Sequence, residues 1–333
     1  MTWKLYIPDG AQDILLGECA RKRKTENAIL AAFEKAGFSE IATPTMEFYD
    51  SFSGQRDIIP EENMIKLVDE HGRIVVLRPD LTVPCARVAA TKLRDVRPLK
   101  VCYCRKVFRS KKDRHLDLKE ITQAGCEIFG RSEAAADAEL IATAVEALKA
   151  AGLRDFTIEL GQVKYFKGLM NETELPFEEK DGLRHLIDKK DFLGLEQRVA
   201  ALGIEGDLKK AINELPALYG GVEILERLRD YRFGGKAKEA ITNLSEVVEI
   251  LKARGYERYL ALDLGMVSEL SYYTGVIFRG FVPGLGTPIL SGGRYDHLVE
   301  KFGDAAPATG FSVHIDYLIE ALTMAEAREG RCR

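Results

Sequence analysis

The chain has 333 residues, which is enough for one large domain or two of moderate size. Its 46% hydrophobic and 30% charged residues are typical of an ordinary globular protein, and a net charge of -4 gives no basic field that would indicate a nucleic-acid partner. No apolar run is long enough to span a bilayer, and the first ten residues lack the pattern of a secretory signal. These features predict a cytoplasmic protein.

The six cysteines follow no disulfide framework, so we expect reduced thiols. Cys102 and Cys104 alternate with Val101 and Tyr103 along a predicted strand, and we expect both cysteines to pack in the core. A metal site would need a second pair of ligands nearby, and the five scattered histidines do not offer one. The sequence therefore predicts no metal and no other cofactor.

The first predicted helix follows a Pro-Asp-Gly turn and runs to about Ala36, where Gly37 is a natural stop. A short strand is expected at Ile41, before the Thr43-Pro44 pair. The expected apolar stripe of the helix comprises Ile14, Leu15, Ile29, Leu30 and Phe33.

A polar turn at Glu70-His71-Gly72 predicts a β-hairpin within residues 64–80. The second arm of this hairpin runs directly into a predicted helix, with Asp80 and Thr82 near the junction. Either side chain suits a helix N-cap, and capping is the simplest interpretation of Asp80.

A longer antiparallel hairpin is predicted between Lys100 and Gly130, because two strand-forming arms flank a charged turn. Along the second arm Gln123, Gly125 and Glu127 share one face with apolar neighbours. Such a face is either exposed, with cross-strand ion pairs, or it lines a site. The glycine leaves room for something to lie against the sheet.

Residues 167–255 are charged and helical, with predicted helices near 192–201, 208–214 and 237–254. Strand patterns return after this stretch, so one β-rich unit is interrupted and then resumed. The predicted organisation is an α+β core of residues 1–166 and 256–325, with a small helical insertion over 167–255 and an antiparallel sheet flanked by helices.

Five segments in order resemble the catalytic core of a class II aminoacyl-tRNA synthetase, specifically histidyl-tRNA synthetase. They are TPTMEF (motif 1, around Pro44), LRPDLT, FRS…TQAGCE (motif 2), LSYYTG (a histidine-specific motif) and SGGRYD…GFSVHIDYL (motif 3). The resemblance covers most of residues 1–325. It implies the synthetase-like sheet and a homodimer formed through the motif 1 region.

Several cations that this family uses to hold ATP are replaced. Ser268 stands where the family has an arginine before the paired tyrosines, and Tyr317 stands where an arginine packs on ATP. In the motif 2 turn, Lys111 replaces a glutamate and Asp117 replaces an arginine. The sequence ends soon after motif 3, so we expect no anticodon-binding domain of the usual kind. Because cations stabilise the charge that develops on the phosphates, we expect crippled adenylate chemistry and no tRNA partner.

The amino-acid pocket of the family is retained by resemblance. By this resemblance, Asp80 and Thr82 would hold the amino group of a bound histidine, and Arg109 would face its carboxylate. Gln123 and Glu127 suit the polar end of the bound histidine. The glutamate can accept from an imidazole N–H, and the two tyrosines would close the ring pocket. The residues are Asp80, Thr82, Arg109, Gln123, Glu127, Tyr272 and Tyr273.

A histidine pocket without ATP machinery resembles the regulatory subunits of ATP phosphoribosyltransferase. This resemblance implies a chain without chemistry of its own that assembles with a short catalytic subunit. It would be required for the activity of that subunit and for histidine feedback inhibition of the first step of histidine biosynthesis. Two alternatives stay open: a divergent histidyl-tRNA synthetase or histidine-activating paralogue, and a structural scaffold whose pocket is a relic.

Overall fold

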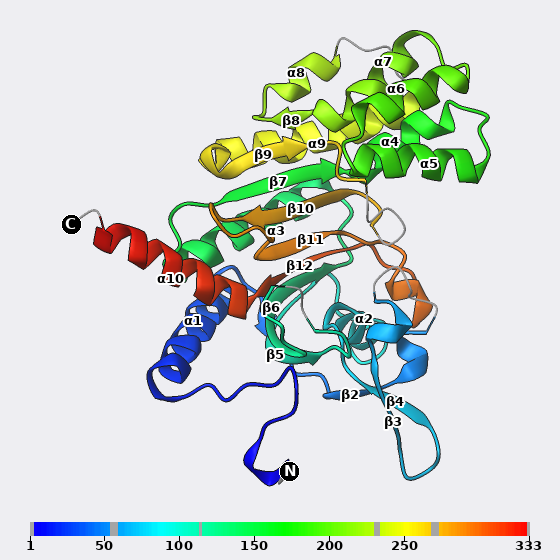
Figure 1. Ribbon diagram of the computed structural model, residues 1–333. Helices are drawn as coiled ribbons and strands as arrows, with labels where there is room; N and C mark the ends of the chain where they lie inside the picture. The colour runs from blue at the N-terminus through cyan, green and yellow to red at the C-terminus, as the bar shows by residue number, and fades with distance from the viewer. Residues whose placement is uncertain (1–2, 54–58, 113–114, 230–233, 268–272, 332–333) are drawn as a thin grey trace.

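The computed structural model describes residues 3–53, 59–112, 115–229, 234–267 and 273–331. Within these residues one large sheet contains strands β1 (Ser39–Glu40), β5 (Leu99–Phe108), β6 (Glu120–Phe129), β7 (Thr157–Gln162), β8 (Tyr219–Gly220), β9 (Leu260–Asp263), β10 (Val276–Phe281), β11 (Leu290–Arg294) and β12 (Ala308–His314). Their order is β1-β5-β6-β12-β11-β10-β7-β9-β8 (Figure 1). Two pairs, β1·β5 and β7·β9, are parallel and the others are antiparallel. The predicted α+β class is confirmed.

The predicted central hairpin is confirmed as β5 and β6. All ten residues of β5 pair with β6, from Leu99 opposite Phe129 to Phe108 opposite Glu120. Strand β12 pairs along the other edge of β6, so the second arm of the hairpin lies inside the sheet. Because β6 is a central strand with both faces covered, its last nine residues are all buried. Eight of these nine residues are uncharged, and Glu127 is the exception.

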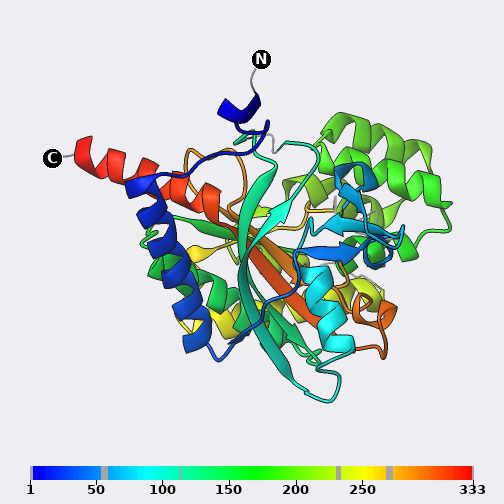
Figure 2. The ribbon, with the colours of Figure 1, turned by 90° about the horizontal axis from the view of Figure 1, so that it is seen from below.

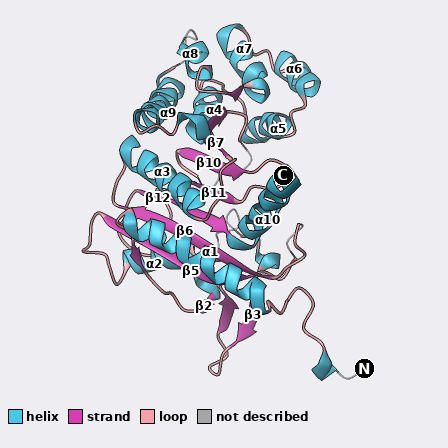
Figure 3. Cartoon of the chain, turned by 90° about the vertical axis from the view of Figure 1, so that its left-hand side faces the viewer, coloured by secondary structure: helices cyan, strands magenta, loops and turns pink. Residues whose placement is uncertain are grey.

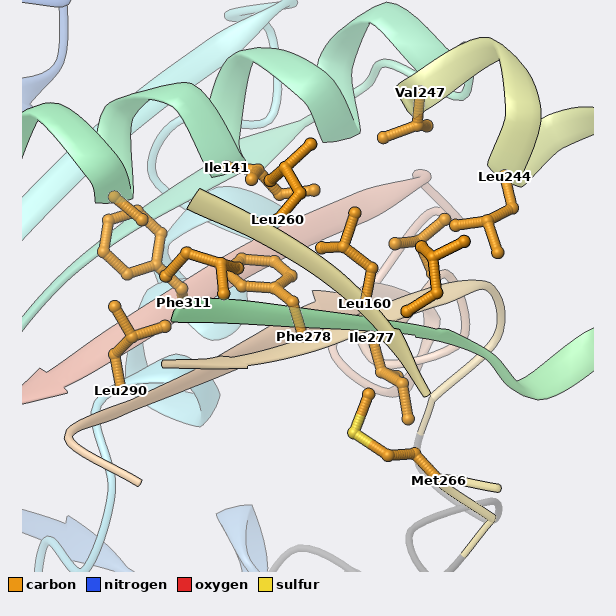
Figure 4. Packing of buried hydrophobic residues seen from close by; sticks show 14 of the residues in the cluster. Ile141, Leu160, Leu244, Val247, Leu260, Met266, Ile277, Phe278, Leu290 and Phe311 are labelled. Carbon is orange, nitrogen blue, oxygen red and sulfur yellow. The ribbon is translucent and has the colours of Figure 1, made fainter. Parts of the chain in front are cut away.

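One face of the sheet is covered by four helices: α1 (Leu16–Lys35), α3 (Ala134–Ala150), α9 (Gly235–Ala253) and α10 (Ile315–Arg331). Figure 3 shows α1, α3 and α10 in front of the strands and α9 above α3, and Figure 4 shows Ile141 and Val247 pointing at Leu160 and Leu260 from this side. Helix α1 ends near Ala36 as predicted, and Gly37 follows with φ +83°. The predictions for Ile14 and Leu15 are wrong, because the helix starts only at Leu16, and the Leu15 side chain is 63% exposed.

The other face of β5 and β6 is covered by a small sheet and by α2 (Thr82–Ala90). The small sheet contains β2 (Met46–Phe48), β3 (Ile65–Val68) and β4 (Ile74–Leu77) in the order β2-β4-β3. Figure 2 shows α2 and the small sheet on the opposite side of the hairpin from α1. The predicted hairpin with its turn at Gly72, where φ is +77°, is confirmed.

A group of helices caps the far end of the sheet, at the top of Figure 1. It contains α4 (Val163–Asn171), α5 (Phe177–Asp188), α6 (Phe192–Ala201), α7 (Gly206–Glu214) and α8 (Ile224–Arg229). Helices α6, α7 and α9 confirm the three predicted helical segments. The predicted boundary at 166–167 falls inside α4, and the division into core and insertion stays a prediction.

Short 3-10 turns occur at Trp3–Leu5, Tyr49–Ser51, Glu61–Asn63, Leu215–Ala217, Glu257–Tyr259 and Val299–Lys301. Over the residues that the structure describes, no helix is long and apolar enough to cross a membrane.

Candidate functional site

The two faces of the β5–β6 hairpin are chemically different. Cys102 and Cys104 are buried in the large core with helices α1 and α3, as predicted. Because side chains alternate along a strand, Tyr103, Gln123 and Glu127 lie on the opposite face, under α2. Gln123 is 8% exposed and Glu127 is 0% exposed. The interpretation of this face as a solvated surface is therefore wrong for both side chains.

Glu127 is enclosed by three hydroxyl groups. The Thr82 hydroxyl donates to Oε1 at 2.9 Å and the Tyr103 hydroxyl donates to the same oxygen at 3.1 Å. The Tyr295 hydroxyl donates to Oε2. A Cβ at Gly310, which faces Glu127 across the β6–β12 pair, would come within 1.4 Å of Oε2. Only glycine at this position leaves space for the carboxyl group.

Burial raises the pKa of Glu127 to about 8. The three hydroxyl groups favour the charged form, but desolvation outweighs them, and the nearby charge of Asp80 raises the pKa further. At neutral pH this carboxyl therefore holds its proton in most molecules. A neutral buried carboxyl can both donate and accept a hydrogen bond.

Asp80 caps helix α2. Leu81 directly precedes the helix and offers no polar side chain, whereas the main-chain N–H of Val83 donates to Asp80 Oδ1 at 2.9 Å, so Asp80 supplies the cap from one residue further back. Burial raises the pKa of Asp80, while the Val83 amide and then the positive charge of Arg109 act in the opposite direction. The cap fixes the first turn of α2, and the Thr82 side chain of that turn reaches Glu127.

Two buried polar atoms at this site have no hydrogen-bond partner among the described residues: Arg109 Nε and Gln123 Oε1. One is a donor and the other is an acceptor. A buried polar group without a partner costs about 1–3 kcal/mol, so a ligand or a water molecule that bonded to these atoms would be stabilised there. The arrangement suits a small molecule that carries both a negative and a positive group.

Tyr273 lies against the glycine-rich strand β11. A Cβ at Gly293 would be 2.9 Å from the Tyr273 ring, so the glycine allows the ring to approach the sheet. Lys167 Nζ donates to the Tyr273 carbonyl at 3.3 Å. Tyr272 and Ser268, which the sequence analysis singled out, lie outside the described residues.

The expectation that Gly125 leaves room for a ligand is wrong. A Cβ at this position would meet the Tyr103 hydroxyl at 2.6 Å and the Phe311 carbonyl at 2.3 Å, so the chain itself occupies the space. The sequence analysis also missed Tyr103 and Tyr295 as site residues. Side-chain alternation along β5 could have identified Tyr103, because it places this residue on the same face as Glu127. For Tyr295 the only indication in the sequence was its hydroxyl group, which needs a hydrogen-bond partner when it is buried.

Two arginines, one just before α2 and one within it, form hydrogen bonds to the motif 1 segment. Arg78 is 4% exposed and donates to the carbonyls of Thr43 and Lys106 at 2.6 and 2.8 Å. Arg87 of α2 donates to both carboxylate oxygens of Glu47 at 3.0 and 2.6 Å. An arginine that donates two hydrogen bonds fixes the orientation of its partners as well as neutralising charge. These contacts therefore help to position the turn at Asp80–Thr82 over the sheet.

The substituted positions of motifs 2 and 3 have partners within the chain. The Tyr317 ring stacks on His314, with 3.7 Å between ring centroids and 10° between ring planes. Lys111 forms an exposed ion pair with Glu62 at 3.3 Å, and Asp117 forms one with a neighbouring lysine at 2.9 Å. Within the described residues, no group of three or more His, Cys, Asp or Glu side chains could hold a metal ion.

A mostly antiparallel sheet of this order, with a small polar site at its central strands, is the architecture of a class II aminoacyl-tRNA synthetase core. The family model described as histidyl-tRNA synthetase matches residues 10–318. A crystal structure from Bacillus halodurans, titled as an ATP phosphoribosyltransferase regulatory subunit/histidyl-tRNA synthetase, is 35% identical and has a TM-score of 0.89. The match covers 97% of this chain and 84% of that one.

Comparison with curated relatives identifies a narrower family than the histidyl-tRNA synthetase family model does. The ATP phosphoribosyltransferase regulatory subunit of Acetivibrio thermocellus is 50% identical over 321 residues, which cover 96% of this chain and 77% of the relative. The protein of the same name from Ruminiclostridium cellulolyticum is 46% identical over 324 residues, or 97% of this chain and 77% of the relative. The chain belongs to the family of ATP phosphoribosyltransferase regulatory subunits, which are non-catalytic components of histidine biosynthesis.

Replacing Glu127 with Gln should change how stability depends on pH. Between about pH 4.5 and about pH 8 the native state keeps a proton on Glu127 that the unfolded chain releases, so this group stabilises the fold fully at low pH and less as pH rises. The free energy of unfolding of the wild type should fall relative to Glu127→Gln by about 1.4 kcal/mol for each pH unit in this window. Denaturant unfolding at several pH values measures the difference, and parallel curves would contradict the assignment.

Proposed function

We propose that this chain assembles in the cytoplasm with the short catalytic subunit of ATP phosphoribosyltransferase and binds the L-histidine that inhibits the complex. The observation that carries the proposal is a pair of buried polar atoms without partners among the described residues, the donor Arg109 Nε and the acceptor Gln123 Oε1, near the hairpin that also carries the buried carboxyl of Glu127. The family supports a regulatory role, and the site supports an amino acid as the regulatory ligand.

The zwitterionic end of the histidine takes the unpaired polar groups. Its carboxylate accepts from Arg109, and its ammonium donates to Gln123 and to Asp80. The positive charge of Arg109 lowers the pKa of Asp80, which supports assigning both side chains to one small-molecule site. Binding then removes the cost of two buried polar atoms without partners.

The imidazole lies between Tyr273 and the hydroxyl groups that surround Glu127. Because Glu127 is 0% exposed, the ring is recognised through these hydroxyls: one that donates to Glu127 can accept from the imidazole N–H. Thr82 and Tyr295 are the candidates for this relay. Direct contact with Glu127 requires one hydroxyl to move aside.

Inhibition follows from linkage. Histidine stabilises whichever arrangement of the complex binds it more tightly, and the equilibrium shifts toward that arrangement by the difference in binding free energy. The chain needs no bond chemistry for this role.

A homodimer through the motif 1 region is part of the proposal. The strands of the small sheet place six apolar side chains on one face, and none of them is buried: Met46, Phe48, Ile65, Leu67, Val75 and Leu77. On the opposite face Val76 is 0% exposed and Glu47 is 7% exposed. An uncovered apolar sheet face of this kind is typical of a protein–protein interface.

Replacing Gln123 with Leu tests the site. The histidine concentration that gives half-inhibition of the complex should rise about tenfold or more, because a hydrogen bond to a charged group is worth roughly 1.5–3 kcal/mol. The empty chain should unfold at the same temperature or higher, because an unpaired buried oxygen is removed. Gln197→Leu, on the exposed surface of α6, is the control. An unchanged inhibition curve would remove the site from the proposal.

Replacing Leu67 with Asp tests the dimer. Leu67 is 43% exposed on the apolar face, and its neighbour Val68 is 72% exposed on the opposite face. A charge buried without a partner at an interface is costly, so Leu67→Asp should dissociate the dimer at micromolar concentration while Val68→Asp should not. Light scattering measures the mass. A monomeric wild type, or equal behaviour of the two variants, would contradict the interface.

Co-expression with a short phosphoribosyltransferase chain tests the assembly. The two chains should co-purify, and the condensation of ATP with phosphoribosyl pyrophosphate should depend on both. Histidine-dependent ATP–pyrophosphate exchange by the purified chain at the rate of a synthetase would favour the histidine-activating alternative instead.

A further inference from the structure

The segment at the end of β11 sends three successive side chains to three different parts of the fold. Because side chains alternate along a strand, Arg294 faces the covering helices and Tyr295 faces the proposed histidine site. Arg294 donates to both carboxylate oxygens of Asp137 in α3, at 2.9 and 3.1 Å. Tyr295 donates to Glu127, and Asp296 contacts the segment that precedes β10. This short segment therefore connects the site to two other elements.

Asp296 and Thr274 form two reciprocal hydrogen bonds. The Thr274 hydroxyl donates to Asp296 Oδ2 at 3.0 Å and accepts from the main-chain N–H of Asp296 at 2.9 Å. The main-chain N–H of Thr274 also donates to the Arg294 carbonyl at 2.7 Å. The other carboxylate oxygen of Asp296 accepts from the main-chain N–H of Ala308 and from Arg294, both at 3.1 Å. Asp296 therefore joins the end of β11, the start of β12 and the segment before β10.

The Arg294–Asp137 ion pair fixes this junction to the helical side of the sheet. Its two side chains are 5% and 2% exposed, and Arg294 also donates to the Arg131 carbonyl at 3.0 Å. Gly275 leaves the room that the arginine needs, because a Cβ there would come within 2.9 Å of Arg294 Cδ. A displaced arginine would leave an unpaired buried charge on each side, so the end of β11 is held in one orientation.

A row of cross-strand neighbours links Glu127 to Tyr273. Gly310 faces Glu127 across the β6–β12 pair, and Gly293 faces Gly310 across the β11–β12 pair. A Cβ at Gly310 would overlap Glu127 Oε2, and a Cβ at Gly293 would come within 2.9 Å of the Tyr273 ring. Neighbouring strands are about 4.8 Å apart, so the carboxyl group and the ring occupy adjacent positions on one face of the sheet.

We propose that Thr274 and Asp296 are positioning residues for recognition of the ligand's ring, because their paired hydrogen bonds hold Tyr273 and Tyr295 at a fixed separation. This inference rests on the proposed function, in which the imidazole lies between Tyr273 and the hydroxyl groups around Glu127. Tyr273 directly precedes Thr274, and Tyr295 directly precedes Asp296. Each member of the hydrogen-bonded pair is therefore the chain neighbour of one tyrosine.

The positioning role follows from how sensitive recognition is to geometry. Side chains that contact a ligand keep their orientation through a surrounding set of hydrogen bonds, and a displacement of about 0.5 Å is enough to weaken recognition. The bonds between Thr274 and Asp296 supply that support here, and the buried Arg294–Asp137 pair anchors it. Loss of the Thr274 hydroxyl would let the two tyrosines move relative to each other while the sheet stays intact.

A change in ring specificity distinguishes positioning from a loss of stability. L-Histidine and β-thienyl-L-alanine have five-membered rings of similar size, and only the first carries a ring N–H. Calorimetry on the complex with the catalytic subunit gives a dissociation constant for each. The wild type should prefer histidine by about a hundredfold or more, because a site that hydrogen-bonds an N–H rejects the analogue without it. Thr274→Val should reduce this preference by about tenfold, and Thr274→Ser, which keeps the hydroxyl, should retain it.

Two further variants complete the test. Thr242→Val is the control, because it removes an exposed hydroxyl that bonds only within α9, and it should keep the wild-type preference. Asp296→Asn replaces an oxygen that accepts from Thr274 or from Ala308, so it should also lower the preference and gives a second measurement if Thr274→Val does not fold. A preference that stays at the wild-type value in the folded variants, even with a lower unfolding temperature, overturns the inference and leaves the proposed function intact. A wild type that binds no histidine overturns both.

Discussion

The burial of one carboxyl group constrains the rest of the site. Glu127 lies in the central strand of the large sheet with no exposed surface, and it is stable there because three hydroxyl groups face it and because Gly310 leaves space beside it. Burial still dominates its protonation, so the group is mostly neutral near pH 7. A neutral carboxyl surrounded by hydroxyls can both donate and accept a hydrogen bond, and this property is the basis of the role that we propose for it in recognising the ring of histidine.

The first turn of α2 connects this carboxyl to the surface that we propose for self-association. Asp80 caps the helix, and Thr82 reaches Glu127 from the same turn. Arg87 and Glu47 join α2 to the small sheet, whose outer face is apolar and uncovered. A ligand bound under α2 and a second subunit on the small sheet would therefore act on one element. In the dimer that we propose, this contiguity would let a ligand under α2 and the second subunit influence each other through one helix.

Several features were predictable from local patterns. The charged turn between two strand-forming arms predicted the β5–β6 hairpin, and side-chain alternation separated Cys102 and Cys104 from Gln123 and Glu127. The glycine after α1 predicted its end. Other features were not predictable, because they depend on partners far along the chain. Tyr295 is 168 residues from Glu127, and nothing near either residue indicates that β11 and β12 bring them together. For the same reason, Gly125 looked like space for a ligand until the Tyr103 side chain was placed beside it.

The sequence by itself determined most of the elements and the two faces of the central hairpin, because periodicity and turn chemistry are local properties. The residues proposed for an amino-acid pocket came from the resemblance of the motifs to a known family. Only the tertiary structure decided which buried polar groups have hydrogen-bond partners within the chain. It showed Glu127 enclosed by hydroxyls, Arg109 Nε and Gln123 Oε1 without partners among the described residues, and Tyr317 stacked on His314. Hydrogen-bond satisfaction and ring contact depend on distances between segments that are remote in sequence, and no pattern along the chain encodes those distances directly.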